Sequence, residues 1–157
     1  MAESYQVISN WFIHKALAAN VEITPMKLQK LLYLAHGWYL GIKGKPLITS
    51  HFHAWKYGPV HRDLYYDYRE LGDSPILKVG NDTGFREESV KDCLNFIWER
   101  YSSLTAIELS NIASKEHSPW DCTMKSYVRT LTNIISNQMI KNYYQMQYKE
   151  IYHENEL

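Results

Sequence analysis

Apolar residues recur every three or four positions through most of this chain, which is the spacing of one face of a helix. The first such run follows Ser4, a residue suited to an N-cap, and covers residues 5–19. The second follows Thr24, another N-cap residue with proline behind it, and Gly41 and Gly44 are expected to end it. Its apolar positions predict a buried stripe of Leu28, Leu31, Leu32, Ala35 and Tyr39.

A different pattern interrupts the helical one at residues 51–57. Phe52 and Ala54 fall on one face of an extended segment, and the residues between them fall on the other, as in a half-buried strand. We expect this strand to pair with residues 45–49 as a small antiparallel hairpin or short sheet. Gly58 and Pro59 then stop the strand, and Pro59 is expected to open a third helix that closes at Gly72.

The second half of the chain returns to helical spacing. Residues 72–86 are dense in turn formers and predict a loop, with a short extended piece at 76–79. Helices are expected over 87–101, from the capping box Thr105–Glu108 to about Ser114, from Ser118 onward, and over 130–148, with a frayed tail from about 150. The predicted core includes Leu28, Leu31, Leu32, Leu94, Ile97 and Ile134.

These elements predict a mainly α (α+β) fold: a single compact helical domain over residues 1–157, with a small antiparallel β element near 45–57. A length of 157 residues fits one domain. Basic and acidic residues both number 17, so a partner that is a nucleic acid is not favoured, whereas self-association is compatible with the low charge. Cys93 and Cys122 are far apart, which fits a reduced, cytoplasmic protein, and no apolar run reaches the length of a membrane span.

Several spaced motifs carry a family resemblance. They are Leu28-Gln-Lys-Leu-Leu-Tyr33, Gly37-Trp-Tyr39, Gly44-Lys-Pro-Leu47 and Ala54-Trp-Lys-Tyr-Gly-Pro-Val60, in that order. Together they resemble the Panacea domain, the SocA-like antitoxin family of phage-associated proteins. The resemblance implies an antitoxin of bacteria, phages or mobile elements that binds a small toxin encoded beside it. It does not extend to Ala113-Ser114, where the family typically carries a Thr-His pair.

The motifs also suggest where a partner would bind. Trp55, Lys56 and Tyr57, held by a rigid turn at Pro59, have the chemistry of an interface hot spot, although large aromatics such as these two belong more often to the core. Further candidate contacts are the polar helix residues Gln29 and Tyr33 and the aromatics Trp38 and Trp120. The resemblance implies that the antitoxin masks the toxin by direct binding, or alternatively hands it to a protease.

The histidines of the sequence suggest two other functions. His51, His53 and His61 could suggest a metal site, but no Asp, Glu or Cys spacing supplies the remaining ligands. His36 could act as an acid or base in an enzyme that inactivates a toxin, but no nucleophile accompanies it in the sequence. We therefore expect no catalytic residue, metal or cofactor, and keep an enzyme and a DNA-binding autoregulator as the alternatives.

Overall fold

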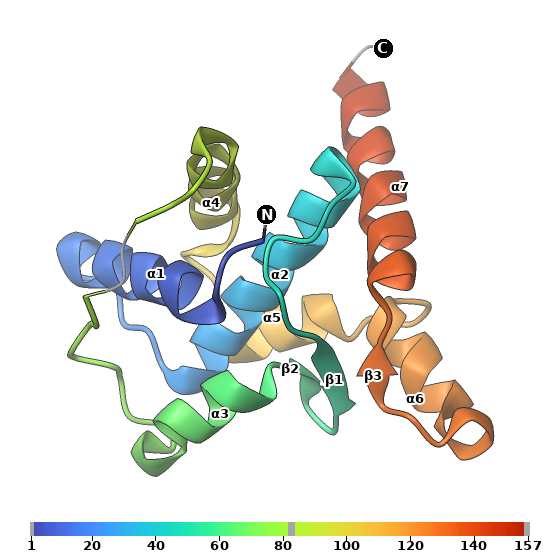
Figure 1. The fold of residues 1–157 in the computed structure, drawn as a ribbon, viewed down its shortest axis with the longest axis horizontal. Coiled ribbons are helices and arrows are strands. Elements are labelled where there is room, and N and C mark those ends of the chain that lie inside the picture. Colours follow the sequence, from blue (N-terminus) through green and yellow to red (C-terminus); the bar gives the residue numbers. More distant parts are fainter. Residues whose placement is uncertain (1, 82–83, 156–157) are drawn as a thin grey trace.

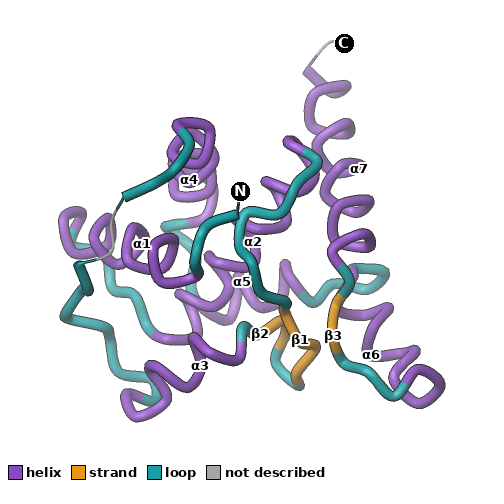
Figure 2. The backbone as a smooth tube through the Cα atoms, in the orientation of Figure 1, coloured by secondary structure: helices purple, strands orange, loops and turns teal. Residues whose placement is uncertain are grey.

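The computed structural model describes residues 2–81 and 84–155, with side chains through residue 152. Within these residues the helices are α1 (Tyr5–Ala19), α2 (Pro25–Lys43), α3 (Arg62–Tyr68), the 3₁₀ turn η1 (Arg69–Leu71), α4 (Glu88–Tyr101), α5 (Ala106–Ala113), α6 (Pro119–Thr130) and α7 (Asn137–Asn155) (Figure 1). The strands β1 (Phe52–Trp55), β2 (Gly58–Val60) and β3 (Ile134–Ile135) form one antiparallel sheet in the order β2-β1-β3 (Figure 2). The expected class, mainly helical with a small antiparallel sheet, is confirmed.

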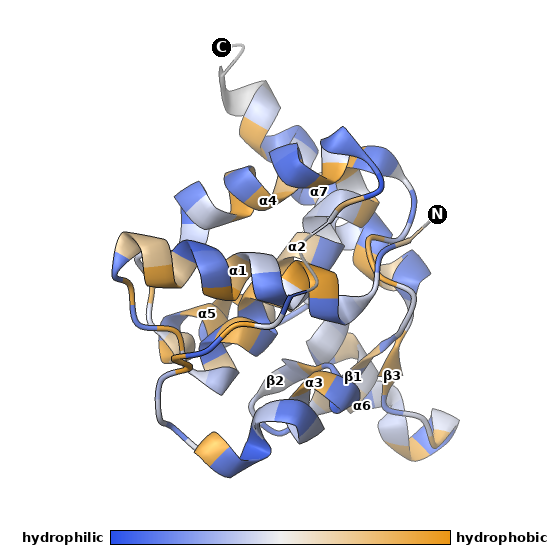
Figure 3. Ribbon diagram, turned by 60° about the vertical axis from the view of Figure 1, so that its left-hand side comes forward, coloured by the Kyte–Doolittle hydropathy of each residue, from blue (hydrophilic) through white to orange (hydrophobic). Residues whose placement is uncertain are grey.

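Helix α2 runs through the middle of the molecule, with α1, α4, α5 and α7 packed around it (Figure 1). Every residue from Lys27 to Gly41 is buried, so the predicted apolar stripe describes only part of what this helix buries. A helix enclosed on all sides must satisfy its own polar side chains inside the protein. The neighbouring helices α1 and α4 instead alternate apolar and polar residues, as Figure 3 shows.

Two glycines let α7 come close to α2. A Cβ atom at Gly41 would lie 2.7 Å from the backbone carbonyl carbon of Tyr144, and one at Gly37 would lie 2.5 Å from the Tyr144 ring. Gly41 was expected to end the helix, and that prediction was wrong, because α2 continues to Lys43 and is capped by Gly44 at φ 75°. The glycine serves close packing between helices rather than termination.

The predicted strand at 51–57 exists, but its predicted partner was wrong. β1 pairs with β2 through the two-residue turn Lys56-Tyr57, and with β3 on its other edge, whereas Ile48 makes a single bridge to Glu3. Gly58 takes φ 117° and so reverses the chain where the sequence suggested only a stop. Pro59 accordingly lies in β2, and α3 begins later, at Arg62.

The last predicted helix begins later than expected, because a short strand precedes it. Helix α6 ends at Thr130, and Leu131 adopts the left-handed conformation. Strand β3 then precedes α7, which continues to Asn155, within the tail that was predicted to fray. The strand turns consecutive side chains to opposite faces, so Ile135 is buried and Ile134 is 42% exposed. The core assignment of Ile134 was therefore wrong, whereas those of Leu28, Leu31, Leu32, Leu94 and Ile97 are confirmed, each at 0% exposure.

Candidate binding corner

The β1–β2 turn lies at one end of the sheet, and we call residues 55–61 the corner segment. Gly58 is required in it for two reasons. Its φ of 117° is a conformation that residues with a Cβ rarely adopt. A Cβ there would also approach the Lys30 ammonium and the Ser110 hydroxyl at 3.3 Å.

Side chains from three helices hold the backbone carbonyls of the corner segment. The indole Nε1 of Trp120 on α6 donates to the Trp55 carbonyl at 2.7 Å. The Ser110 hydroxyl on α5 donates to the Tyr57 carbonyl. The Lys30 ammonium on α2 donates to the Pro59 carbonyl at 3.0 Å.

Gln29 completes this set at the end of the corner segment. Its side-chain amide donates to the His61 carbonyl at 2.9 Å and accepts from the His61 N–H at 2.8 Å. Alternate carbonyls from 55 to 61 thus each accept a hydrogen bond from a side chain outside the segment. The backbone of the turn is therefore fixed by tertiary contacts in addition to the pairing of β1 with β2.

Lys30 is the most unusual member of this frame. Its side chain is 2% exposed, and no ion pair involves it within the described residues. Burial away from water lowers the pKa of its ammonium group to about 8. The hydrogen bond to the Pro59 carbonyl is therefore what satisfies a buried cation at this position.

The same geometry points the turn's side chains toward solvent. Tyr57 is 63% exposed, and the Lys56 ammonium lies 5.4 Å from its ring centroid. Trp55 is half-buried, and its ring meets that of Tyr65 edge-on with centroids 5.0 Å apart. The aromatic surface thus continues from the corner segment onto α3.

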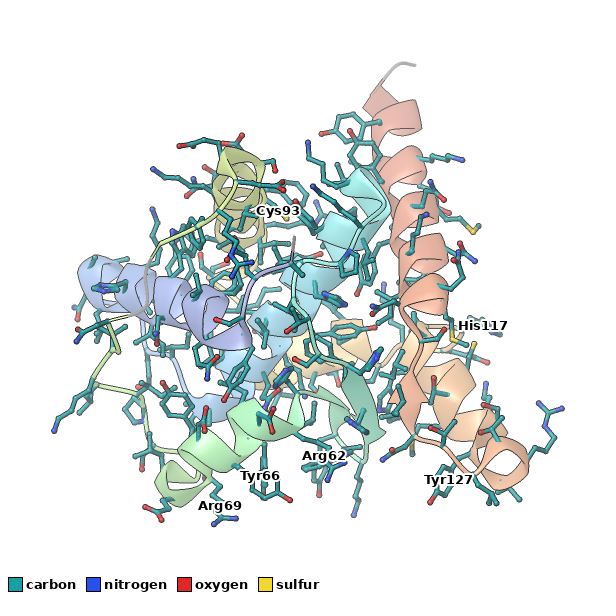
Figure 4. All side chains as sticks on the ribbon, viewed as in Figure 1. Arg62, Tyr66, Arg69, Cys93, His117 and Tyr127 are labelled. Atoms are coloured by element: carbon teal, nitrogen blue, oxygen red, sulfur yellow. The ribbon has the colours of Figure 1, made fainter. Side chains whose placement is uncertain are left out.

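Helix α3 extends this surface with further aromatic and basic residues. The Tyr65 and Tyr66 centroids are 5.8 Å apart, and the Arg69 guanidinium lies 5.2 Å from the Tyr66 ring. Figure 4 shows Tyr66 and Arg69 on the side of α3 that points away from the rest of the molecule. Exposed tyrosines next to arginines have the composition of a protein-binding surface.

The structure separates the residues that the sequence nominated for binding. Trp55, Lys56, Tyr57 and Trp120 lie together at the corner segment, the first and last half-buried and the middle two exposed. The remaining four, Gln29, Tyr33, Trp38 and Pro59, are buried. Gln29 supports the corner segment through its two hydrogen bonds to His61, and Pro59 is part of the segment itself.

Trp38 and Tyr33 are core residues away from the corner surface. The Trp38 indole is 2% exposed and donates to the Tyr101 hydroxyl at 2.9 Å. Tyr33 is fully buried and meets Phe52 edge-on at 5.1 Å. Neither presents surface to a partner in this arrangement.

Two of the histidines are buried, and both ring nitrogens of each contact neighbouring groups. His36 Nδ1 accepts from the Ile48 N–H, and its Nε2 lies 2.9 Å from the Asn137 side-chain oxygen, so Nε2 carries the proton. Burial lowers the pKa of His36 to about 4. His61 caps α3 by accepting from the Leu64 N–H through Nδ1, and its Nε2 faces the Ser50 hydroxyl, with burial again lowering the pKa.

The histidines do not come together in the metal or enzyme site that the sequence left as an alternative. Within the described residues no three His, Cys, Asp or Glu side chains gather as metal ligands would. Two hollows of about 410 and 240 Å³ are lined by other residues, the first around Trp11 and Arg86 and the second around Tyr39 and Phe96. His36 instead joins α2 to α7 and to the segment before β1.

Sequence reasoning overlooked Lys30, Ser110 and Tyr65. Lys30 directly precedes Leu31 and Leu32 of the predicted apolar stripe, which was a visible signal, because a lysine at such a place is either exposed or specifically bonded. Ser110 carries no comparable signal, since its role depends on where α5 packs. Tyr65 is 43% exposed beside Trp55, a position that likewise depends on how α3 packs.

Comparison with known proteins places this arrangement in a family. Residues 28–121 match the family model described as antitoxin SocA-like, Panacea domain. A relative, the antitoxin SocA of Caulobacter vibrioides (strain NA1000 / CB15N), is 30% identical over 127 residues, covering 74% of this chain and 68% of the relative. The chain belongs to the SocA-like antitoxin family with a Panacea domain.

Two further findings accompany the family assignment. No solved structure matches the chain at a significant level. Across the described part of the chain, no helix combines the length and the apolar character that crossing a bilayer requires. The matched segment contains every residue of the corner frame, from Gln29 to Trp120.

Proposed function

We propose that this protein is an antitoxin that neutralises a small toxin by direct binding, and that the corner segment is part of the surface that covers the toxin. The family assignment supports the antitoxin role. The observation that carries the binding proposal is the frame of Gln29, Lys30, Ser110 and Trp120, which fixes a two-residue turn whose side chains face solvent. A preorganised turn loses little conformational freedom on binding.

Masking requires no chemistry from the antitoxin. A stable complex needs roughly 1,200–2,000 Å² of total buried surface and a few anchoring side chains. Tyr57, Trp55 and Tyr65 supply aromatic area, and Lys56 supplies a cation beside it. This function accounts for the exposed aromatics without invoking the buried histidines as catalysts.

The test is co-expression with the toxin gene that neighbours this gene. Wild type is compared with Tyr57→Ala and with Ile107→Ala, a matched control that removes an apolar side chain 70% exposed on α5. Loss of a hot-spot side chain weakens binding about thirtyfold or more. Growth rescue and the affinity of the purified pair should fall for Tyr57→Ala and stay unchanged for the control.

Thermal melts separate binding from folding in this experiment. Tyr57 is mostly exposed, so its truncation should leave the melting temperature unchanged, and a loss of rescue then reports on the interface. No rescue by wild type would reject the antitoxin role toward that toxin. Full rescue by Tyr57→Ala and by Lys56→Ala would remove the corner segment from the interface.

A further inference from the structure

Helix α6 carries an apolar stripe that no described part of the chain covers. Met124, Tyr127, Val128 and Leu131 follow the i, i+3, i+4, i+7 spacing of one helix face. Their side chains are 40%, 49%, 83% and 79% exposed, whereas the buried residues of α6 are Pro119 and Thr123. Figure 4 shows Tyr127 on the outer side of this helix.

Leu131 is an unexpected residue for its backbone conformation. It caps α6 at φ 59° and ψ 21°, a left-handed conformation in which glycine or asparagine is usual and a branched side chain is sterically unfavourable. Because its side chain is 79% exposed, burial within the fold does little to offset this unfavourable conformation. A leucine at this point gains contact only when something else covers it.

The stripe has a basic edge. Lys125 and Arg129 lie one helical turn apart beside Val128, and Asp121 precedes them by another turn. The Asp121 carboxylate is engaged by Lys125 at 2.8 Å and by the His117 N–H, and this neighbourhood holds its pKa below the ordinary value. Arg129 forms no ion pair with any residue that the structure describes.

We infer that this stripe binds an amphipathic helix of the partner, with apolar residues at the same spacing and carboxylates along the edge that meets Arg129. The inference rests on the proposed function, since the helix is assigned to the toxin. Seven residues of rise make the stripe about 10 Å long, which suits two turns of a docked helix. Charge complementarity selects an acidic edge over a basic one.

The stripe adjoins the corner segment rather than forming a separate site. Trp120 stands one turn before Met124 on α6, and its indole bonds the Trp55 carbonyl. Two helical turns alone offer less than the roughly 800 Å² per partner of a standard interface, which argues against a stable homodimer built on this stripe. Joined to the corner segment, the stripe belongs to one larger binding surface.

The stripe lies outside the segment that the family model matches. The family match ends at Asp121, and the four stripe residues all follow it. The corner frame, in contrast, lies within the matched segment.

The test uses two synthetic helical peptides as probes. Both carry leucine at the i, i+3, i+4, i+7 positions, and their remaining positions are glutamate in one and lysine in the other. Amide chemical shifts of the labelled protein are followed during titration with each peptide. The glutamate peptide should bind at least about tenfold more tightly than the lysine peptide, perturb residues of α6, and lose this advantage at high salt.

Variants separate this contact from general hydrophobic adhesion. Val128→Asp and Leu131→Gly should each weaken binding of the glutamate peptide by about tenfold or more, whereas the control Ile107→Asp should not. Leu131→Gly should melt at the same temperature as wild type or higher, because glycine relieves the left-handed strain. A binding loss in a protein that is no less stable cannot be ascribed to unfolding.

Several outcomes would overturn the inference. They are equal binding of the two peptides, shift changes centred away from α6, no binding to wild type, or a wild-type dimer that Val128→Asp converts to monomer. The toxin co-expression assay keeps the two proposals apart. Rescue that persists in Val128→Asp and Leu131→Gly rejects the stripe and leaves the antitoxin role intact. Peptide binding without any wild-type rescue rejects the antitoxin role toward that toxin, not the stripe.

Discussion

The Lys30 ammonium donates to the Pro59 carbonyl at 3.0 Å within the core, beneath the exposed turn of the sheet. One side chain thereby links the most enclosed helix of the protein to its candidate binding surface. The lysine brings a titratable charge into an interior that otherwise disfavours charge. The unfolding free energy of the protein should therefore depend on whether Lys30 is protonated.

We expect Lys30 to make stability rise with pH. Its folded-state pKa of about 8 lies below the unfolded value near 10.5, so the unfolded chain binds more protons between these pH values. The unfolding free energy of wild type relative to Lys30→Met should increase by roughly 1 kcal/mol per pH unit from pH 8 to 10. Urea titrations of both proteins measure this difference, and a pH-independent difference would contradict it.

The buried histidines should make the protein sensitive to acid. The pKa of His36 is lowered to about 4, below the ordinary 6.5, so its stabilising contribution is complete above pH 6.5 and is lost as pH falls toward 4. Between pH 7 and 4.5 this single group should account for roughly 2–3 kcal/mol of lost stability. His36→Gln should lose less on acidification than wild type, whereas the exposed control His117→Gln should lose as much.

The corner segment should depend on Gly58. Gly58→Ala forces a Cβ into a φ of 117° and to within 3.3 Å of Lys30 and Ser110, so we expect a loss of about 1–3 kcal/mol. Gly84→Ala is the matched control, because a Cβ there meets nothing within 4 Å. Denaturant melts of the two variants compare them directly, and equal stabilities would show that the turn tolerates a side chain.

Leu32 and Ile134 were both predicted to be core residues, and truncating each of them should have different effects on stability. Leu32 is fully buried on α2, and Leu32→Ala should cost about 2–5 kcal/mol. Ile134→Ala should cost markedly less, because its side chain is 42% exposed on β3. Thermal or urea unfolding provides the measurement, and similar losses would mean that β3 is packed differently.

Local signals in the sequence were sufficient for most helices. Ser4, Thr24 and Thr105 each accept a hydrogen bond from a backbone N–H of the first turn, as their positions before apolar runs predict. The pairing of β1 could not be read this way. Strand pairing is a tertiary property, and the β3 partner lies about 80 residues further along the chain.

The exposed side chains of the corner segment could be predicted from the sequence, whereas the side chains that hold its backbone could not. Trp55 to Tyr57 drew attention through residue type and a rigid turn, and the structure places them at the surface edge of the sheet. The supporting contacts of Lys30 and Ser110 depend on how α2 and α5 pack against the turn, which no spacing in the sequence specifies. The sequence indicated a helix from Ser118, but not that one apolar face of it stays exposed, because the face that a helix leaves uncovered is set by tertiary packing.

The carbonyl frame of the corner segment has a consequence for how binding competence is lost. Because α2 holds two of its carbonyls and α5 and α6 hold one each, opening the turn requires breaking contacts to all three helices. The population able to bind the toxin should then equal the population that is globally folded. Any influence that unfolds the protein, such as acid acting through His36, would then reduce the proposed toxin binding in step with the folded population, with no partly active state in between.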